Sequence, residues 1–277
     1  MEITNEFNTL RRLAQMHINL RTIKQYAESN RKSIQLRIEN WVTPFGVLPL
    51  AVYANTLGLT ITTGRNKRSV RSYLQRIYFP RGISDLNWIK SSSYLPISKL
   101  RIKTDDQYLT KYEDLIISKI KNKKIRFPFQ NSLKYLTSEM ITNINEHAMV
   151  DHYWIVAQYW PKTKTCEIAI ADTGIGYKES YKGTAYEVEN HIEAIMNAIQ
   201  GNSSKDDIER GTGIPGMINI FCKGYGGCVV IMSGDTLLLI EKEQQDFYSL
   251  EVGWRGVFIG IRFKVSEINA LEYLSGY

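Results

Sequence analysis

Apolar residues in the first third of the chain switch between helical and strand spacing. Residues 5–29 contain neither proline nor glycine, and their apolar positions recur at an approximately helical period, which predicts a helix. Alternating apolar positions over residues 34–38 predict a strand, and a proline and a glycine then mark a turn. The apolar run 47–57 predicts a helix and residues 59–62 a second strand, so this segment is expected to fold as strand, helix, strand.

The rest of the chain continues to alternate between the two patterns. A basic helix is expected at 67–78, and irregular residues 84–104 lead into a strand at 97–102. The lysine-rich stretch 105–124 has the spacing of a helix that links two domains, so we place a domain boundary near residue 105. Beyond it, helices are expected at 136–148 and 215–223, and strands at 155–159, 167–171, 228–232 and 256–263.

Length and composition are those of an ordinary globular protein. The 277 residues can form one large domain or two smaller ones, and 43% of them are hydrophobic and 23% charged. No apolar run is long enough to span a membrane, and the first residues lack a secretory signal pattern. The three cysteines are not spaced for a zinc site or a disulfide framework. We expect a soluble protein of the reducing cytoplasm.

The net charge of +7 is unevenly distributed, with +11 on residues 1–105 and −4 on residues 106–277. A basic N-terminal half can bind nucleic acid or an acidic protein surface, or it can simply be solvated. Arginines and tyrosines interleave over residues 67–78, a composition that can contact phosphates and stack on bases. Because Leu74 and Ile77 add an apolar stripe, we favour the interpretation in which the tyrosines pack inward and the arginines face water.

Three short motifs follow one another within about eighty residues. They are Glu139-Met-Ile-Thr-Asn143, Asp172-Thr-Gly174-Ile-Gly176 and Gly211-Thr-Gly213-Ile-Pro-Gly216. In this order they resemble the GHKL nucleotide-binding fold of DNA gyrase B subunits, heat-shock chaperone ATPases, mismatch-repair ATPases, sensor histidine kinases and anti-sigma-factor serine kinases. The resemblance implies an α/β sandwich, the Bergerat fold, that binds ATP and Mg²⁺.

Glu139 and Asn143 are four residues apart in a predicted helix, so their side chains project from one helical face. The resemblance implies that the Asn143 side-chain oxygen coordinates Mg²⁺ and that Glu139 polarises the water that attacks the γ-phosphate. The chemistry agrees, since Mg²⁺ prefers hard oxygen ligands. A carboxylate can accept a proton from a water that it reaches directly or through one bridging molecule.

Asp172 stands at the end of the strand predicted at 167–171. A carboxylate there can accept a hydrogen bond from the exocyclic amine of adenine, which selects adenine because guanine presents a carbonyl at that place. Gly174 and Gly176 are expected to let the backbone bend and approach the base without a Cβ clash.

The segment 197–217 resembles the lid of the same fold followed by its glycine-rich box. Gly211, Gly213 and Gly216 leave backbone N–H groups free to converge on phosphate oxygens, and a helix that begins near Pro215 adds its positive dipole. The candidates to close over the phosphates are Ser203, Ser204, Lys205 and Arg210. For the two basic residues, the alternative is a solvated loop.

One position departs from the family pattern. Many members have Gly-Thr in the last strand, where the threonine hydroxyl helps to anchor adenine through water, whereas this chain has Gly256-Val257 there. Valine cannot donate that hydrogen bond. Either Thr236 or Ser233 replaces the hydroxyl, or adenine binds more weakly than is usual.

The segment Ile38–Leu50 resembles the strand-to-helix turn of STAS domains, the small α/β modules of anti-sigma antagonists and bacterial sensors. The expected fold class is therefore α/β with two domains. An N-terminal helix and a STAS-like module occupy residues 1–105, and the GHKL domain occupies residues 106–277. Where a STAS domain would carry a phosphorylatable serine before glycine, this chain has Phe45 before Gly46.

Three functions of different classes agree with these motifs. The first is a slow Mg²⁺-dependent ATPase in which lid closure switches a protein partner or a homodimer, with Glu139 as the base. The second is an anti-sigma-factor-like serine/threonine kinase, which the STAS-like neighbour favours and Phe45 opposes. The third is a regulatory module that binds ATP without chemistry. A sensor histidine kinase is not expected, because no histidine lies in a recognisable phosphoacceptor helix upstream.

Overall fold

The structure is a computed structural model that describes residues 3–38, 42–64, 66–84, 93–102, 110, 113–114, 117–118, 120–202, 213–266, 268 and 270–273. The strands are β1 (Ser33–Gln35), β2 (Thr60–Thr62), β3 (Tyr94–Arg101), β4 (His152–Trp160), β5 (Thr165–Ala171), β6 (Cys228–Glu241) and β7 (Gln244–Lys264). The α-helices are α1 (Ile3–Glu28), α2 (Pro44–Thr56), α3 (Arg68–Arg76), α5 (Lys123–Asn143), α6 (Gly176–Ser180), α7 (His191–Gln200) and α8 (Gly213–Ile218). Two π-helical turns, η1 (Ile144–Ala148) and η2 (Asn219–Gly224), extend α5 and α8, and η3 (Ala270–Tyr273) is a 3₁₀ turn.

The protein is mixed α/β and is organised around one antiparallel sheet. Within the described residues this sheet has five strands in the order β3-β4-β5-β7-β6, while β1 and β2 form a separate parallel pair. In that pair Ile34 lies opposite Ile61, which confirms the predicted strand, helix, strand order with α2 as the connecting helix. None of the described helices combines the length and the apolar character that a membrane span requires.

Most predicted elements are present, and α5, β6 and β7 extend furthest beyond the ranges that their patterns indicated. α5 begins at Lys123, where the Asn122 side chain caps it by accepting a hydrogen bond from the backbone N–H of Lys124 at 3.0 Å. β6 and β7 form a long hairpin that continues past the predicted apolar runs, because paired backbone groups stabilise strands even where the side chains are half exposed. The helix predicted at 105–124 lies mostly outside the described residues.

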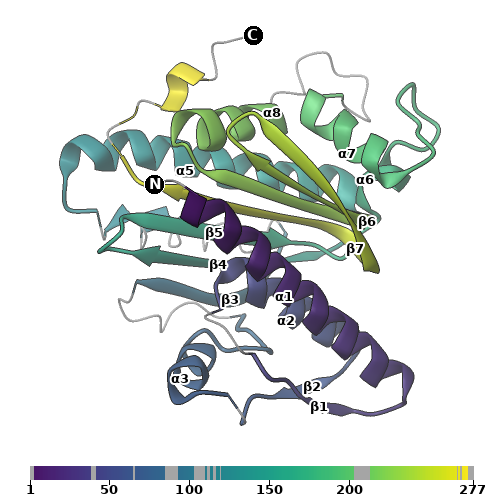
Figure 1. The fold of residues 1–277 in the computed structure, drawn as a ribbon. Coiled ribbons are helices and arrows are strands. Elements are labelled where there is room, and N and C mark those ends of the chain that lie inside the picture. The colour runs from purple at the N-terminus through teal and green to yellow at the C-terminus, as the bar shows by residue number, and fades with distance from the viewer. Residues whose placement is uncertain are drawn as a thin grey trace.

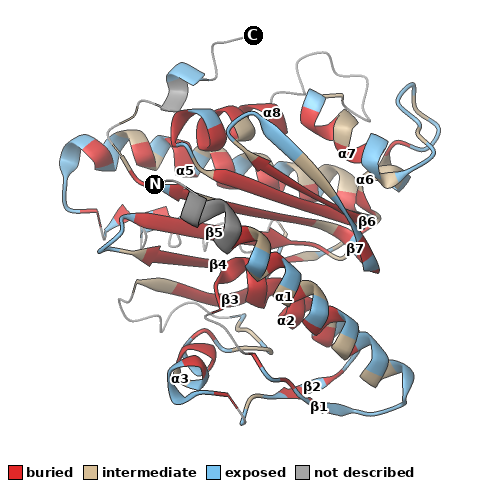
Figure 2. Cartoon of the chain, viewed as in Figure 1, coloured by how far each residue is buried: buried red, intermediate tan, exposed pale blue. Residues whose placement is uncertain are grey.

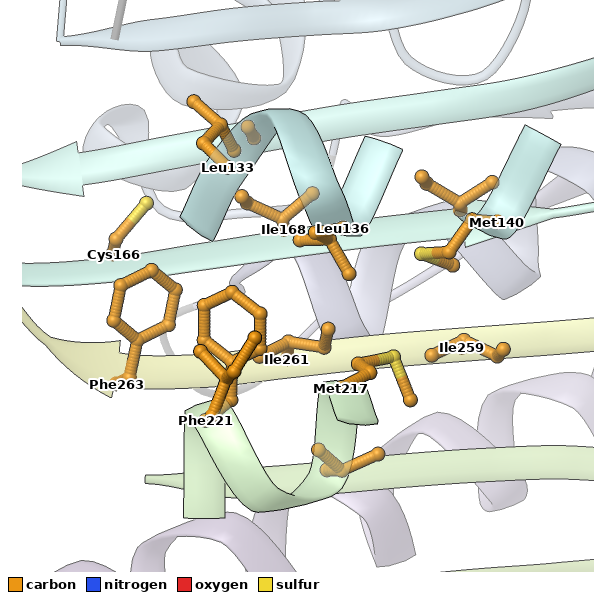
Figure 3. Close-up of a cluster of buried hydrophobic side chains, with 14 of the residues drawn as sticks. Leu133, Leu136, Met140, Cys166, Ile168, Met217, Phe221, Ile259, Ile261 and Phe263 are labelled. Atoms are coloured by element: carbon orange, nitrogen blue, oxygen red, sulfur yellow. The ribbon is translucent and has the colours of Figure 1, made fainter. Parts of the chain in front are cut away.

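Both faces of the five-stranded sheet are buried, and helices cover each of them (Figure 1). Because successive side chains on a strand point to opposite faces, Ile168 and Ile170 of β5 face α5 and α8, while Ala169 and Ala171 face α1 and α2. Figure 2 shows the central strands buried along most of their length. On the α5 side, Figure 3 shows Leu136 and Phe221 meeting Ile261 over the sheet.

The predicted boundary near residue 105 falls between β3 and α5, and the contacts cross it. β3 is hydrogen-bonded to β4, with Leu100 opposite Tyr153. The helices α1 and α2 share one apolar cluster with β4, β5, β6 and β7. The N-terminal segment is thus packed against the sheet, and its division into a separate domain stays a prediction.

A buried carboxylate joins the N-terminal helices to the sheet. Glu167 of β5 is fully buried, and its Oε1 accepts a hydrogen bond from the backbone N–H of Phe45, at the start of α2, at 2.8 Å. Its Oε2 lies 3.8 Å from Nη1 of Arg12 and 3.6 Å from Nη1 of Arg262, its cross-strand neighbour on β7. The Phe45 ring rests on Gly260, where a Cβ atom would lie 2.7 Å from it. The Phe45 ring thus occupies the space that a side chain at residue 260 would need.

The basic helix α3 buries one of its two candidate stacking residues. Tyr73 is buried with Val70 and Leu74, whereas the four arginine and lysine side chains Lys67, Arg68, Arg71 and Arg76 are exposed. Tyr78, just beyond the helix, is 39% exposed. Tyr73 thus packs inward, as the apolar stripe indicated, and it is not available to stack on a base.

The Glu167 carboxyl predicts a pH-dependent contribution to stability. Burial raises its pKa to about 7, although the Phe45 backbone, the Thr43 hydroxyl and Arg12 act to lower it. Because the folded state then retains a proton that the unfolded chain releases, this group's contribution to the free energy of unfolding falls as pH rises from about 4.5 to about 7. Glutamine does not titrate, so the free energy of unfolding of Glu167→Gln should lack this fall. The difference in free energy of unfolding between the variant and the parent should therefore shift in favour of the variant by roughly 3 kcal/mol from pH 5 to pH 8, as measured by urea unfolding.

The matched control is Glu251→Gln, which removes an exposed carboxylate paired with Arg21 at 2.9 Å. Loss of that pair should change the free energy of unfolding by less than about 1 kcal/mol. Parallel pH profiles for the parent and Glu167→Gln would contradict a titrating carboxyl at this junction.

Candidate functional site

A cavity of about 250 Å³ lies between the sheet and the helices that cover its α5 side. One wall comes from α5 and η1, with Glu139, Asn143, Glu146 and His147. The floor comes from the sheet, with Ile170, Val257 and Ile259 beside Asp172. α6, the end of α7 and the start of α8 complete the lining. The cavity is thus lined by residues from all three predicted motifs.

The structure brings Glu139 and Asn143 together with Gly213, seventy residues later in the chain. A Cβ atom at residue 213 would collide with Oε2 of Glu139 and lie 3.7 Å from Nδ2 of Asn143. α5 is anchored on the sheet by Met140 and Ile144, so the two polar side chains one turn apart reach the cavity edge. A carboxylate, an amide and the half-buried backbone of Gly213 therefore meet at the edge of the cavity.

Glu139 is a stronger base than an exposed glutamate. Burial raises its pKa, and the negative charge of Glu146 raises it further. Glu146 lies on the π-helical turn η1 and its Oε2 is 3.9 Å from Nε2 of His147, which also lines the cavity. Such turns are frequent at functional sites, and this one directs both side chains toward the same space.

Asp172 lines the same cavity directly after the end of β5. It is 2% exposed, and its Oδ1 accepts a hydrogen bond from the backbone N–H of Gly174 at 2.8 Å. Its own backbone N–H donates to the carbonyl oxygen of Val257 at 2.9 Å. Burial raises the pKa of Asp172 to about 6, although the backbone N–H groups of Gly174 and Val257 act on its carboxylate to lower the pKa. At neutral pH the carboxylate is an acceptor held in fixed orientation.

At three positions near the cavity only glycine fits, because other protein atoms occupy the space that a Cβ atom would take. A Cβ at Gly174 would collide with the carbonyl group of Ala148, at the end of η1. Gly176 has φ +74°, and its Cβ would lie 2.8 Å from Oγ of Ser233. Gly256 has φ +86°, and a Cβ there would collide with Asp172. The steric role predicted for Gly174 and Gly176 is thus met by contacts within the protein.

Neither proposed replacement for the missing threonine hydroxyl lines the cavity. Ser233 is buried behind the glycine loop, where its hydroxyl donates to the carbonyl of Gly256 at 3.1 Å and accepts from the backbone N–H of Tyr177 at 3.2 Å. Thr236 donates to Asp235 and is not among the lining residues. Val257 itself lines the cavity, and its side chain offers no hydroxyl.

Several predicted residues do not take part in the described cavity. Neither Gly174 nor Gly216 lines it, and Gly216 is buried inside α8. Five candidates lie outside the described residues, namely Ser203, Ser204, Lys205, Arg210 and Gly211. The lid that these residues were predicted to form stays a prediction.

One wall of the cavity was not predicted from the sequence. Tyr177, Ser180 and Tyr181 line it from α6 and the residue that follows, and the Tyr181 hydroxyl donates to the backbone oxygen of Asn202 at 2.7 Å. The tyrosines are four residues apart, directly after the glycine motif, and this spacing places them on one helical face. This spacing could have predicted that both tyrosines line the same wall.

The described lining of the cavity carries carboxylate and amide side chains but no lysine or arginine. No cluster of three or more histidine, cysteine, aspartate or glutamate side chains placed to hold a metal occurs in the described ranges. A scan against protein-family models and a search of curated proteins both find no match to the chain.

The contact between the glycine loop and η1 gives a steric prediction. Gly174→Ala should lower the free energy of unfolding by roughly 3 kcal/mol, because the added methyl group has no room beside the Ala148 carbonyl. Gly253→Ala is the matched control, since its Cβ would lie 3.7 Å from the nearest atom. That variant should change stability by less than about 1 kcal/mol in the same chemical unfolding experiment. Equal effects of the two substitutions would show that the loop yields easily.

Proposed function

We propose that this cavity binds ATP with Mg²⁺ and that the protein is a slow ATPase of the GHKL class. The observation that carries the proposal is the placement, around one cavity, of a buried aspartate at a strand end and a Glu–Asn pair on the facing helix. These residues come from separate motifs, and the order of the motifs matches that family. The antiparallel sheet with α5 and α8 on one face supports the same assignment.

The Asp172 end of the cavity would hold adenine. The carboxylate is an acceptor-only group whose Oδ1 is oriented by the Gly174 N–H, and it would accept a hydrogen bond from the adenine amine. Ile170, Val257 and Ile259 give that end an apolar floor suited to a base. Tyr177 lies beside them on α6. Since no threonine hydroxyl assists Asp172, most of the discrimination for adenine would rest on this one carboxylate.

The Glu139 end would hold the phosphates. Asn143 would provide one oxygen ligand to Mg²⁺, whose charge neutralises the phosphate oxygens when both are bound. Gly213 brings backbone within contact of Glu139, so that a phosphate placed there would meet backbone N–H groups as well as the side chains. The two groups of lining residues together would suit a ligand with a flat base at one end and negative charge at the other.

Glu139 would act as the general base. It takes a proton from water as the oxygen of that water bonds to the γ-phosphorus and the bond to the β-bridging oxygen breaks, which gives ADP and inorganic phosphate. Its raised pKa, caused by burial and Glu146, brings its basicity closer to what proton transfer near neutral pH requires. Val257 lacks the hydroxyl with which many members of the family anchor adenine, and this is one reason to expect slow turnover.

The N-terminal strand–helix–strand is proposed to be a STAS-like module docked on the back of the sheet, opposite the cavity. This arrangement bears on the kinase alternative. Phe45 is buried against Gly260, and Thr43, in the same turn, is 1% exposed, so neither position presents a hydroxyl to a kinase. A substrate for phosphate transfer would have to come from another chain.

Asp172 provides a test of base recognition with a pH signature. Asp172→Asn should weaken ATP binding by about ten- to a hundredfold, the effect of losing a charged hydrogen bond of roughly 1.5–3 kcal/mol. Because the pKa of Asp172 is about 6, parental affinity should also fall as pH drops below 6, by about tenfold per pH unit, as the acceptor becomes protonated. Calorimetry across pH 4.5–8 should show no such fall for the Asn variant; equal affinities at pH 8 would remove Asp172 from the site.

Glu139 and Asn143 separate chemistry from binding. Glu139→Gln keeps the shape and hydrogen-bonding capacity but loses basicity, so ATP should still bind while turnover falls by about 10²–10⁴-fold. Asn143→Ala should weaken the Mg²⁺-dependent part of ATP affinity as well. γ-labelled ATP distinguishes the fates of phosphate: free phosphate supports the ATPase, label on a partner protein favours the kinase, and binding without turnover favours the regulatory module.

A further inference from the structure

A second cavity, of about 180 Å³, lies on the opposite side of the sheet, between α1 and the start of α2. Its polar lining comes mainly from one face of α1, with Arg11, Arg12, Gln15 and Asn19. Thr43 and Gly46 line it from the turn into α2, and Met16 and Leu50 give it apolar walls. None of these residues lines the candidate ATP cavity.

Asn19 indicates that this cavity is built for a polar ligand. Its side chain is 5% exposed and faces the cavity, and within the described ranges the structure gives its amide no hydrogen-bond partner. Because no described protein group pairs with this amide, its donor and acceptor atoms stay available to a molecule that enters the cavity.

The charge at the rim favours an anion. Arg11 is exposed and lines the cavity, and among the described residues it has no carboxylate partner. Arg12 lies 3.8 Å from Glu167, which is shared with Arg262, so the local group of three arginines and one buried carboxylate keeps a positive excess. Guanidinium groups match the oxygens of phosphate with two parallel hydrogen bonds.

The length of the cavity defines the ligand further. Arg12 and Asn19 are seven residues apart on one helix, or about 10 Å at 1.5 Å per residue, which is too far for one phosphate group to touch both. We propose that this cavity binds a small organic phosphate, with the phosphate at Arg11 and Arg12 and a hydroxyl-bearing body that reaches Gln15 and Asn19. The site is independent of ATP binding, since α2 and the sheet separate the two cavities.

The test is calorimetric titration of the full chain with three probes: inorganic phosphate, ribose 5-phosphate and ribose. Ribose 5-phosphate should bind saturably and more tightly than inorganic phosphate, because it engages both ends of the cavity. Arg11→Gln should weaken both phosphate probes by about tenfold, the effect of one charge-assisted hydrogen bond. Asn19→Leu should remove only the advantage of ribose 5-phosphate over inorganic phosphate.

Two controls make the result decisive. Arg21→Gln removes an exposed arginine of the same helix that lies outside the cavity, and it should leave binding unchanged. The double substitution Asp172→Asn with Asn143→Ala alters the other cavity and should also leave it unchanged. The proposal is overturned if no probe binds saturably, if Arg11→Gln and Asn19→Leu bind as the parent does, or if the double variant abolishes binding. Arg11 is exposed, so its variant tests the site without a risk to folding.

Discussion

The sheet is apolar on both faces, and this one constraint governs the rest of the molecule. An antiparallel sheet can leave one face in water, but here Ile168 and Ile170 point one way and Ala169 and Ala171 the other, and all four are buried. Two layers of helices must therefore cover it. On the first face α5 and α8 leave a cavity between themselves and the strands, and on the second α1 and α2 close over the sheet.

One strand places a carboxylate on each of those faces. Glu167 and Asp172 differ by an odd number of residues, so the period of two along β5 directs them to opposite sides. Each is buried, each has a pKa raised by burial, and each accepts a hydrogen bond from a backbone N–H, of Phe45 and of Gly174 respectively. The difference lies in the neighbours. Arg12 and Arg262 flank Glu167, which joins α2 to the sheet, whereas Asp172 adjoins a cavity and can accept a hydrogen bond from a ligand.

This arrangement gives the N-terminal segment a structural role that charge alone did not indicate. Its net charge of +11 suggested nucleic acid as one possible partner. However, the Tyr73 side chain is buried, and the Arg12 guanidinium lies beside the Glu167 carboxyl group. Phe45, which opposed a phosphorylatable turn, fills the space above Gly260. The same docking creates the second cavity, because α1 crosses the start of α2 without filling the space beside Asn19.

The sequence by itself determined the elements and the local geometry of the motifs. Period and turn residues indicated α1, β1, α2, β2 and the helix carrying Glu139 and Asn143, since hydrophobic spacing and the four-residue repeat are properties of a single segment. Only the tertiary structure decided what the glycines and hydroxyls contact. Gly174 meets Ala148, Gly256 meets Asp172, and Ser233 is committed to Gly256, all through approaches between segments distant in the chain. Such contacts depend on how strands and helices stack, and no local pattern contains that distance information.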